Sequence, residues 1–149
     1  MPSGLTFDPS QGLSMTKRPR VMVVNDTQEI LELFRDILEE EGFEVSLYSF
    51  AFHDLKEIEE ATPDLVILDF LIGGEAQGWQ LLQKMKMHRG TQNIPVIVCT
   101  AAVQMVRELE GHLTAKGVGL VLKPFDIDDL IATVHEVMAR APAGVEPIA

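Results

Sequence analysis

The segment Leu65-Val66-Ile67-Leu68-Asp69 is a short apolar run that ends in a carboxylate. Such a run, with no polar residue inside it, is typical of a strand that is buried on both faces of a parallel sheet. An ionised carboxylate is almost never fully buried without a partner, because its lost hydration is costly. We therefore expect Asp69 to lie at the carboxyl edge of a sheet, where open α/β folds build their binding sites.

Similar apolar runs predict further strands at residues 21–24, 95–99 and 118–122, and residues 43–48 are predicted to form another strand. Apolar residues at helical spacing separate them and predict helices that contain residues 30–38, 51–61, 77–89, 103–113 and 130–138. Strands that alternate with helices imply a parallel sheet with right-handed crossovers. The predicted fold class is α/β: a doubly wound five-stranded parallel sheet of flavodoxin-like order 2-1-3-4-5, with helices on both faces.

Composition limits the classes of partner. The chain has 149 residues, of which 46% are hydrophobic and 23% charged, as in an ordinary globular domain. Its formal net charge is −11. Non-specific binding to nucleic acid needs a basic face on the protein, so we expect no nucleic-acid partner. A single cysteine, Cys99, fits a reducing compartment and most simply fills the core. No stretch approaches the roughly 18 apolar residues of a membrane span, so we expect no membrane partner and a cytoplasmic location.

Composition also divides the chain into three parts. Residues 1–18 are small, polar and interrupted by Pro and Gly, which predicts a flexible N-terminal extension. Residues 19–140 should form the folded domain. Residues 141–149 contain two prolines and a glycine and should form a C-terminal tail.

Polar side chains stand at the carboxyl ends of four predicted strands. Asn25 and Asp26 follow the first strand, Asp69 the third, Thr100 the fourth and Lys123 the fifth. In a parallel sheet these ends share one edge, and the four strands are neighbours in the predicted order. Two close carboxylates repel each other and favour a cation between them, and oxygen ligands suit Mg²⁺. A carboxylate nucleophile beside a metal, a hydroxyl and an ammonium group is typical of phosphoryl transfer.

Over about residues 19–140 the chain resembles a response-regulator receiver domain of two-component signalling. Four motifs in the right order carry the resemblance: Val21-Met22-Val23-Val24-Asn25-Asp26, Pro63-Asp64-Leu65-Val66-Ile67-Leu68-Asp69, Ile94-Pro95-Val96-Ile97-Val98-Cys99-Thr100-Ala101 and Lys123-Pro124-Phe125. The last resembles the family's Lys-Pro motif, which usually contains a cis peptide bond.

The resemblance implies a phosphoacceptor switch and not a turnover enzyme. Asp69 would accept the phosphoryl group, and Thr100 and Lys123 would hold it. The donor would be a sensor histidine kinase or a phosphotransfer protein. Because we expect no output domain after residue 140, the chain would act as a single-domain regulator through an unknown downstream protein. By analogy, a homodimer would form through helix 4, strand 5 and helix 5.

The resemblance also implies Mg²⁺ as the cofactor, with Asp26, Asp69 and the backbone carbonyl of Leu71 as ligands. Asn25 stands where the family usually has an acid. An amide can still hold a metal-bound water, so Asn25 would be a weak or water-mediated ligand. We expect lower Mg²⁺ affinity and slower phosphorylation as a result.

Three further positions depart from the family pattern. Leu120 stands where the family usually has a Tyr or Phe that moves with the threonine, so the readout would lack both a ring and a hydroxyl. Leu71 and Ala102 follow Asp69 and Thr100 by two residues, where polar side chains can position the hydrolytic water in the family. Neither side chain can form a hydrogen bond, which predicts a slowly decaying phosphoryl group.

Two alternatives stay open. The first is a pseudo-receiver, a protein-interaction module that does not rely on phosphorylation; Asn25 and Leu120 favour it, and the intact phosphoacceptor, threonine and lysine positions oppose it. The second is an enzyme or a flavin carrier on the same fold. A phosphatase would usually need an Asp at position 71, and no Ser/Thr/Gly-rich phosphate loop follows the first strand. Asp26 alone could also simply cap the first helix.

Overall fold

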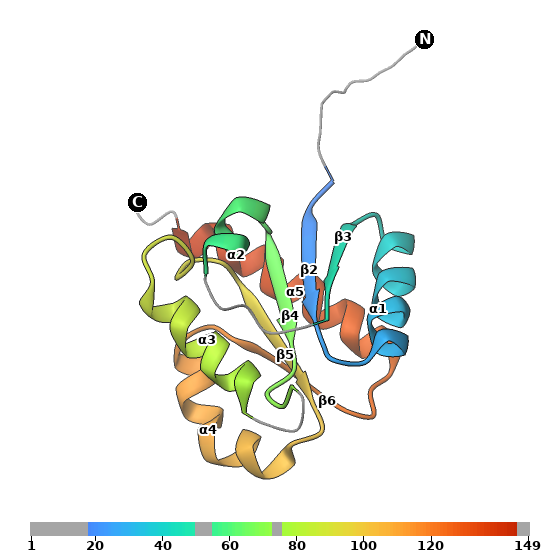
Figure 1. Ribbon diagram of the computed structural model, residues 1–149. Helices are drawn as coiled ribbons and strands as arrows, with labels where there is room; N and C mark the ends of the chain where they lie inside the picture. The colour runs from blue at the N-terminus through green and yellow to red at the C-terminus, as the bar shows by residue number, and fades with distance from the viewer. Residues whose placement is uncertain (1–17, 50–54, 73–75, 146–149) are drawn as a thin grey trace.

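The structure is a computed structural model that describes residues 18–49, 55–72 and 76–145. Most of the expected N-terminal extension, residues 1–17, therefore lies outside the described residues. Strands and helices alternate along the described chain (Figure 1). The strands are β2 (Arg20–Val24), β3 (Glu44–Tyr48), β4 (Leu65–Leu68), β5 (Val96–Thr100) and β6 (Gly119–Leu122). The helices are α1 (Gln28–Glu40), α2 (Lys56–Ala61), α3 (Gln77–Met87), α4 (Val103–Ala115) and α5 (Ile127–Val145).

The five strands form one parallel sheet in the spatial order β3-β2-β4-β5-β6. Counted along the chain this order is 2-1-3-4-5, so the predicted fold is confirmed. The pairing register aligns the strand ends, because Val24 lies opposite Leu68 and Leu68 lies opposite Val98. Neighbouring strands lie about 4.8 Å apart. The residues that follow these ends are therefore brought together at one edge of the sheet.

Successive residues of each central strand face two different cores, as the pleat of a strand requires. Val21 and Val23 of β2 belong to a core beneath α1 and α5, whereas Met22 and Val24 belong to a core beneath α2, α3 and α4. Figure 1 shows these helices in two layers, one on each side of the sheet. Both faces of the sheet are thus covered, which explains why its central strands β4 and β5 are buried and almost wholly apolar.

Some helix predictions need correction. The predicted helix 77–89 ends two residues early, at Met87, because His88 already has extended backbone angles. Helix α5 continues to Val145, past residue 140 where we expected the folded domain to end. Pro142 and Gly144 lie inside this stretch and disfavour a helix interior, which is why the sequence pattern predicts a tail there and not a helix. Of the predicted helix 51–61, residues 51–54 lie outside the described part and α2 covers Lys56–Ala61.

Candidate functional site

An ion pair joins the two residues that the sequence singled out most clearly. Asp69 follows β4 and Lys123 follows β6, and the Lys123 Nζ atom donates a hydrogen bond to Asp69 Oδ2 at 2.9 Å. Strand β5 lies between these two strands, so the lysine side chain spans it at the sheet edge. The two side chains are 13% (Asp69) and 23% (Lys123) exposed. Limited exposure reduces solvent screening, so this pair is stronger than a typical surface pair.

The second carboxylate oxygen of Asp69 is held by the backbone. The Leu71 N–H group donates to Asp69 Oδ1 at 3.1 Å. An ammonium group and a backbone amide therefore orient the carboxylate from two sides. The side chain nevertheless keeps some exposure, so one face of it can meet a ligand.

Thr100 lies at the end of β5 and is 1% exposed. Its Oγ1 atom accepts a hydrogen bond from the Ala102 N–H group at 3.1 Å. The backbone N–H group of Lys123 donates to the Thr100 carbonyl at 2.9 Å, which ties the ends of β5 and β6 together. A hydroxyl that accepts a bond keeps its own hydrogen as a donor. Rotation about the Cβ–Oγ1 bond leaves this hydrogen available as a donor while the oxygen keeps its bond to Ala102.

The Asn25 side chain folds the turn that leads into α1, whose N-cap residue is Thr27 and whose start has no side-chain cap hydrogen bond. The Asn25 Oδ1 atom accepts a hydrogen bond from the Thr27 N–H group at 2.9 Å, and the Asn25 side chain is buried. Asp26 is exposed, and its Oδ1 atom accepts a bond from the Thr27 hydroxyl at 3.3 Å. As a metal ligand, Asn25 would therefore have to offer an amide oxygen that already accepts a hydrogen bond from the Thr27 N–H group.

The oxygen groups at this edge are suited to Mg²⁺ in kind and number. Within the described ranges, no three His, Cys, Asp or Glu side chains gather closely enough to hold a metal ion. Asp26 and Asp69 would supply the two carboxylates, and carbonyl oxygens or waters would supply the rest. Mg²⁺ is commonly bound by one or two carboxylates with several waters retained, so the residues fit this ion.

Gly78 is part of the site although the sequence analysis did not select it. The N–H groups of Gly78 and Trp79 both donate to the Phe70 carbonyl, at 3.0 and 3.2 Å. A Cβ atom on residue 78 would overlap the Asp69 carbonyl oxygen and lie 2.7 Å from the Asp69 carbonyl carbon. Helix α3 therefore starts directly against the backbone of Asp69. The available signal was a glycine inside a helical pattern, which often marks a close backbone approach.

Cys99 lies beneath the site and is a core residue, as expected. Its side chain is buried, and that burial raises the pKa of the thiol to about 12, with Lys123 opposing and Asp69 adding to the effect. The thiol is therefore neutral near pH 7 and a poor nucleophile. The peptide bond between Lys123 and Pro124 is cis, as the resemblance implied.

Leu120 is half-buried in β6, opposite Val98, and packs against the core beneath α2, α3 and α4. An aliphatic side chain thus fills the position for which the resemblance implied an aromatic ring. In the part of the chain that the structure describes, no helix has the length and apolar character needed to span a bilayer.

Comparison with known proteins identifies relatives of the chain. The family model of the response regulator receiver domain matches residues 21–135. The phosphate regulon transcriptional regulatory protein PhoB of Rhizobium meliloti is 32% identical over 123 residues, which are 83% of this chain and 53% of that protein. The DNA-binding response regulator MtrA of Mycolicibacterium smegmatis is 28% identical over 125 residues, which are 84% of this chain and 53% of that protein.

Solved structures show the same fold. A CheY-like response regulator receiver domain protein of Methanospirillum hungatei superposes with a TM-score of 0.73 and 25% identity, over 86% of this chain and 99% of that one. The response regulator TrrA of Thermotoga maritima, solved in complex with Mg²⁺-BeF, gives a TM-score of 0.68 and 28% identity, over 80% of this chain and 98% of that one.

The chain spans about half the length of the curated relatives it matches. Two of these relatives are named as a transcriptional regulator and a DNA-binding regulator. Our expectation that the chain has no nucleic-acid partner therefore finds no support among its relatives. That expectation used the net charge of this chain alone, which does not bear on the segments of the relatives that the chain does not match.

Proposed function

The chain belongs to the response regulator receiver domain family, and we propose that it is a phosphoacceptor switch with Asp69 as the acceptor. The observation that best supports this proposal is the 2.9 Å bond between Lys123 Nζ and Asp69 Oδ2, at the carboxyl edge of the sheet. A fixed cation beside a partly exposed carboxylate suits the approach of a phosphoryl group. The chain would take one phosphoryl group onto itself and would not turn over a substrate.

The proposed transfer begins with an oxygen of the Asp69 carboxylate attacking the phosphorus of a phosphohistidine. The new O–P bond forms, the P–N bond breaks, and the electron pair leaves with the imidazole of the donor. Lys123 Nζ, which pairs with Asp69 before transfer, would then neutralise an oxygen of the bound phosphoryl group. The Thr100 hydroxyl would donate its hydrogen to another oxygen of that group.

We propose Mg²⁺ as the cofactor of this transfer, held by Asp26, Asp69 and the Leu71 carbonyl, with Asn25 acting through a bound water. When bound, the ion would neutralise charge on the phosphoryl oxygens. The solved complex of the Thermotoga relative with Mg²⁺-BeF supports this choice of ion. Because the Asn25 oxygen already accepts the Thr27 N–H group, its contribution to binding would be weak.

The proposed donor is a sensor histidine kinase or a phosphotransfer protein, and the output goes to a downstream protein or to a second copy of the chain. A homodimer would use the face formed by α4, β6 and α5. Val103, Leu122 and Ile127 are exposed apolar side chains at the ends of these elements nearest the site. Gel filtration with and without beryllofluoride and Mg²⁺ tests this output, since a dimer should appear only in their presence.

The decisive experiment is intact mass after incubation with acetyl phosphate, with and without Mg²⁺. We expect the unmodified chain and Asp36→Asn, a change on the exposed surface of α1, to gain one phosphoryl group only with Mg²⁺. Asp69→Asn should gain none, because it keeps the shape of the side chain and loses the nucleophile. No gain at saturating Mg²⁺ in any variant would refute the switch.

That negative result would favour the second candidate, a pseudo-receiver that binds a partner without phosphorylation. The orientation of Asn25 supports this candidate, because the amide oxygen faces the start of α1 and accepts the Thr27 N–H group. The intact Asp69–Lys123 pair supports the switch instead.

A further inference from the structure

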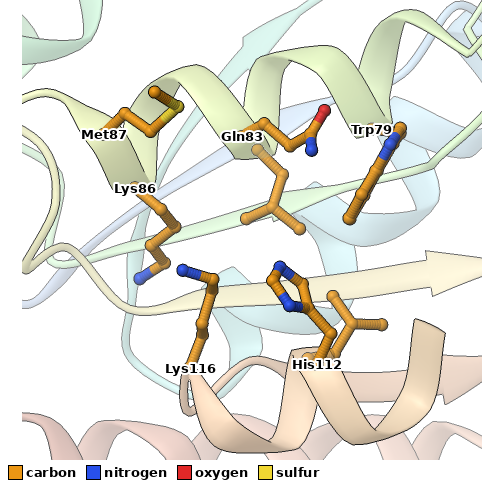
Figure 2. A pocket seen from close by; sticks show the side chains of 8 residues that line it. Trp79, Gln83, Lys86, Met87, His112 and Lys116 are labelled. Atoms are coloured by element: carbon orange, nitrogen blue, oxygen red, sulfur yellow. The ribbon is translucent and has the colours of Figure 1, made fainter.

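A small pocket lies between α3 and α4 and shares none of the residues assigned to phosphoryl transfer. Its volume is about 170 Å³. Figure 2 shows Lys86 and Trp79 reaching it from α3, and His112 and Lys116 from α4 and its C-terminal end. Leu82 and Leu113, both buried, contribute apolar surface. The pocket thus combines apolar walls with two lysines and a histidine.

The two lysines of this pocket face each other without an acidic partner. In Figure 2 the side chains of Lys86 and Lys116 point toward one another. Among the described residues, neither lysine forms an ion pair with a carboxylate. In the described part of the chain, the Lys86 Nζ atom donates to two neutral carbonyls, those of Gln92 at 3.3 Å and Ile94 at 3.1 Å. Burial, and then the charge of Lys116, lower the pKa of the Lys86 ammonium group.

This arrangement is unusual in an acidic chain. The protein has 23 acidic residues against 12 lysines and arginines, so acidic partners for two close lysines are abundant in the sequence. Like charges that face each other raise the free energy of both charged forms, and an anion between them removes that cost. The charge pattern of the pocket therefore selects an anionic ligand.

The rest of the pocket selects an aromatic group of limited size. The Trp79 and His112 rings meet edge to face, with centroids 6.1 Å apart. In Figure 2 the Trp79 ring lies at the end of the pocket away from the two lysine nitrogens. A cavity of about 150 Å³ is enough to hold benzene, so this pocket has room for one ring.

We propose that this pocket binds a small anion that carries one aromatic ring, of the aryl carboxylate or aryl phosphate class. The anionic group lies between Lys86 and Lys116, and the ring packs against Trp79, Leu82 and Leu113. The proposal does not depend on phosphoryl transfer at Asp69, since the two sites have no residue in common. It concerns a free small molecule and not a peptide segment.

The test uses phenyl phosphate and benzoate as probes, with benzamide as the neutral control, on the full chain without Mg²⁺. Trp79 is the single tryptophan of the chain and lines this pocket, so its fluorescence reports binding there, and Asp69→Asn controls for a response from the nearby phosphoacceptor site. Isothermal titration calorimetry gives a second measurement in case the fluorescence does not respond. We expect saturable binding of at least one anion and much weaker binding of benzamide. Asp69→Asn should bind the anions as tightly as the unmodified chain.

Two lysine variants and one control locate the binding. Lys86→Met and Lys116→Met should each weaken anion binding roughly tenfold or more, the value of a lost charge-assisted hydrogen bond. Lys84→Met removes an exposed lysine of α3 that does not line the pocket, and it should change nothing. Since Lys116 is exposed, its variant should fold even if Lys86→Met does not.

Several results would overturn the proposal. They are no heat and no fluorescence change with either anion, equal affinity of both lysine variants and the unmodified chain, or benzamide binding as tightly as benzoate. Binding of an acidic peptide but of neither ring anion would also reject it, and would assign the pocket to a protein partner. Loss of binding in Asp69→Asn would place the anion at the phosphoacceptor site instead.

Discussion

The contact between Gly78 and Asp69 makes a strong prediction about Gly78→Ala. In an ordinary helix interior, replacing Gly with Ala stabilises a protein by up to about 1 kcal/mol. Here the new Cβ atom would overlap the Asp69 carbonyl oxygen and approach the carbonyl carbons of Asp69 and Phe70 at 2.7 and 3.0 Å. These are backbone atoms beside a buried strand, so they cannot rotate away as a side-chain tip could.

The structure sets the size of the effect. Forcing an extra carbon into a packed site costs about 1–3 kcal/mol. The shift would also weaken the hydrogen bonds from the Gly78 and Trp79 N–H groups to the Phe70 carbonyl, each worth about 1 kcal/mol. After subtracting the helix-propensity gain, we expect Gly78→Ala to lower the free energy of unfolding by about 1–3 kcal/mol. In a chain of this size, that lowers Tm by roughly 3–10 °C.

Urea unfolding followed by circular dichroism measures this change, and Gly111→Ala is the matched control. Gly111 also lies in a helix, α4, and a Cβ atom there would meet nothing within 4 Å. We expect Gly111→Ala to stabilise the chain by about 0.5–1 kcal/mol, opposite in sign to Gly78→Ala. If Gly78→Ala were as stable as Gly111→Ala, the close approach of α3 to Asp69 would be wrong. If Gly78→Ala were also phosphorylated more slowly, the contact would have a second role in positioning Asp69.

Three further predictions follow from the other contacts of the site. The unfolded Cys99 thiol loses its proton near pH 9.0 and the folded one near pH 12, so stability should fall by about 1.4 kcal/mol per pH unit between them. Cys99→Ala should lack this alkaline slope in urea unfolding, and an equal slope in both proteins would contradict the assignment. Asn25→Asp adds a carboxylate beside Asp69 and should tighten Mg²⁺ binding roughly tenfold by calorimetry; an unchanged Kd would exclude residue 25 from the metal site. Phosphorylated chain should lose its phosphoryl group over minutes, because Leu71 and Ala102 offer no side-chain hydrogen bond to a water, whereas decay within seconds by mass spectrometry would disprove this.

The sequence was sufficient for the sheet because each strand carries its own local signal. An apolar run that ends in a polar residue identifies both a strand and its carboxyl end, and the parallel order then assembles the site. Asp69 and Lys123 were expected to meet on this ground, and they do. The cis peptide bond before Pro124 was implied by the resemblance to the family's Lys-Pro motif. Composition and periodicity alone do not predict it.

Features that depend on the direction of a single hydrogen bond could not be predicted in this way. Asn25 and Asp26 are adjacent and either side chain can accept a backbone N–H group in the turn before α1, so only the tertiary structure decides that Asn25 accepts the Thr27 N–H group. Leu33 belongs to the apolar pattern that predicts the helix at residues 30–38, yet it is 43% exposed, because it lies at the edge of the apolar stripe of α1. The closeness of Gly78 to Asp69 also needs the path of a loop that has no periodic pattern.

The same few backbone groups support both the fold and the proposed switch. The Phe70 carbonyl accepts the two N–H groups that anchor the start of α3, and Phe70 directly follows the acceptor. The backbone N–H group of Lys123 donates a hydrogen bond to the Thr100 carbonyl, while its side-chain ammonium group donates one to Asp69. A phosphoryl group on Asp69 would give the lysine ammonium a new partner and would offer the Thr100 hydroxyl an acceptor. A backbone hydrogen bond joins Lys123 to Thr100, so a change at either residue would reach the ends of both β5 and β6. These ends lie next to the face proposed for output.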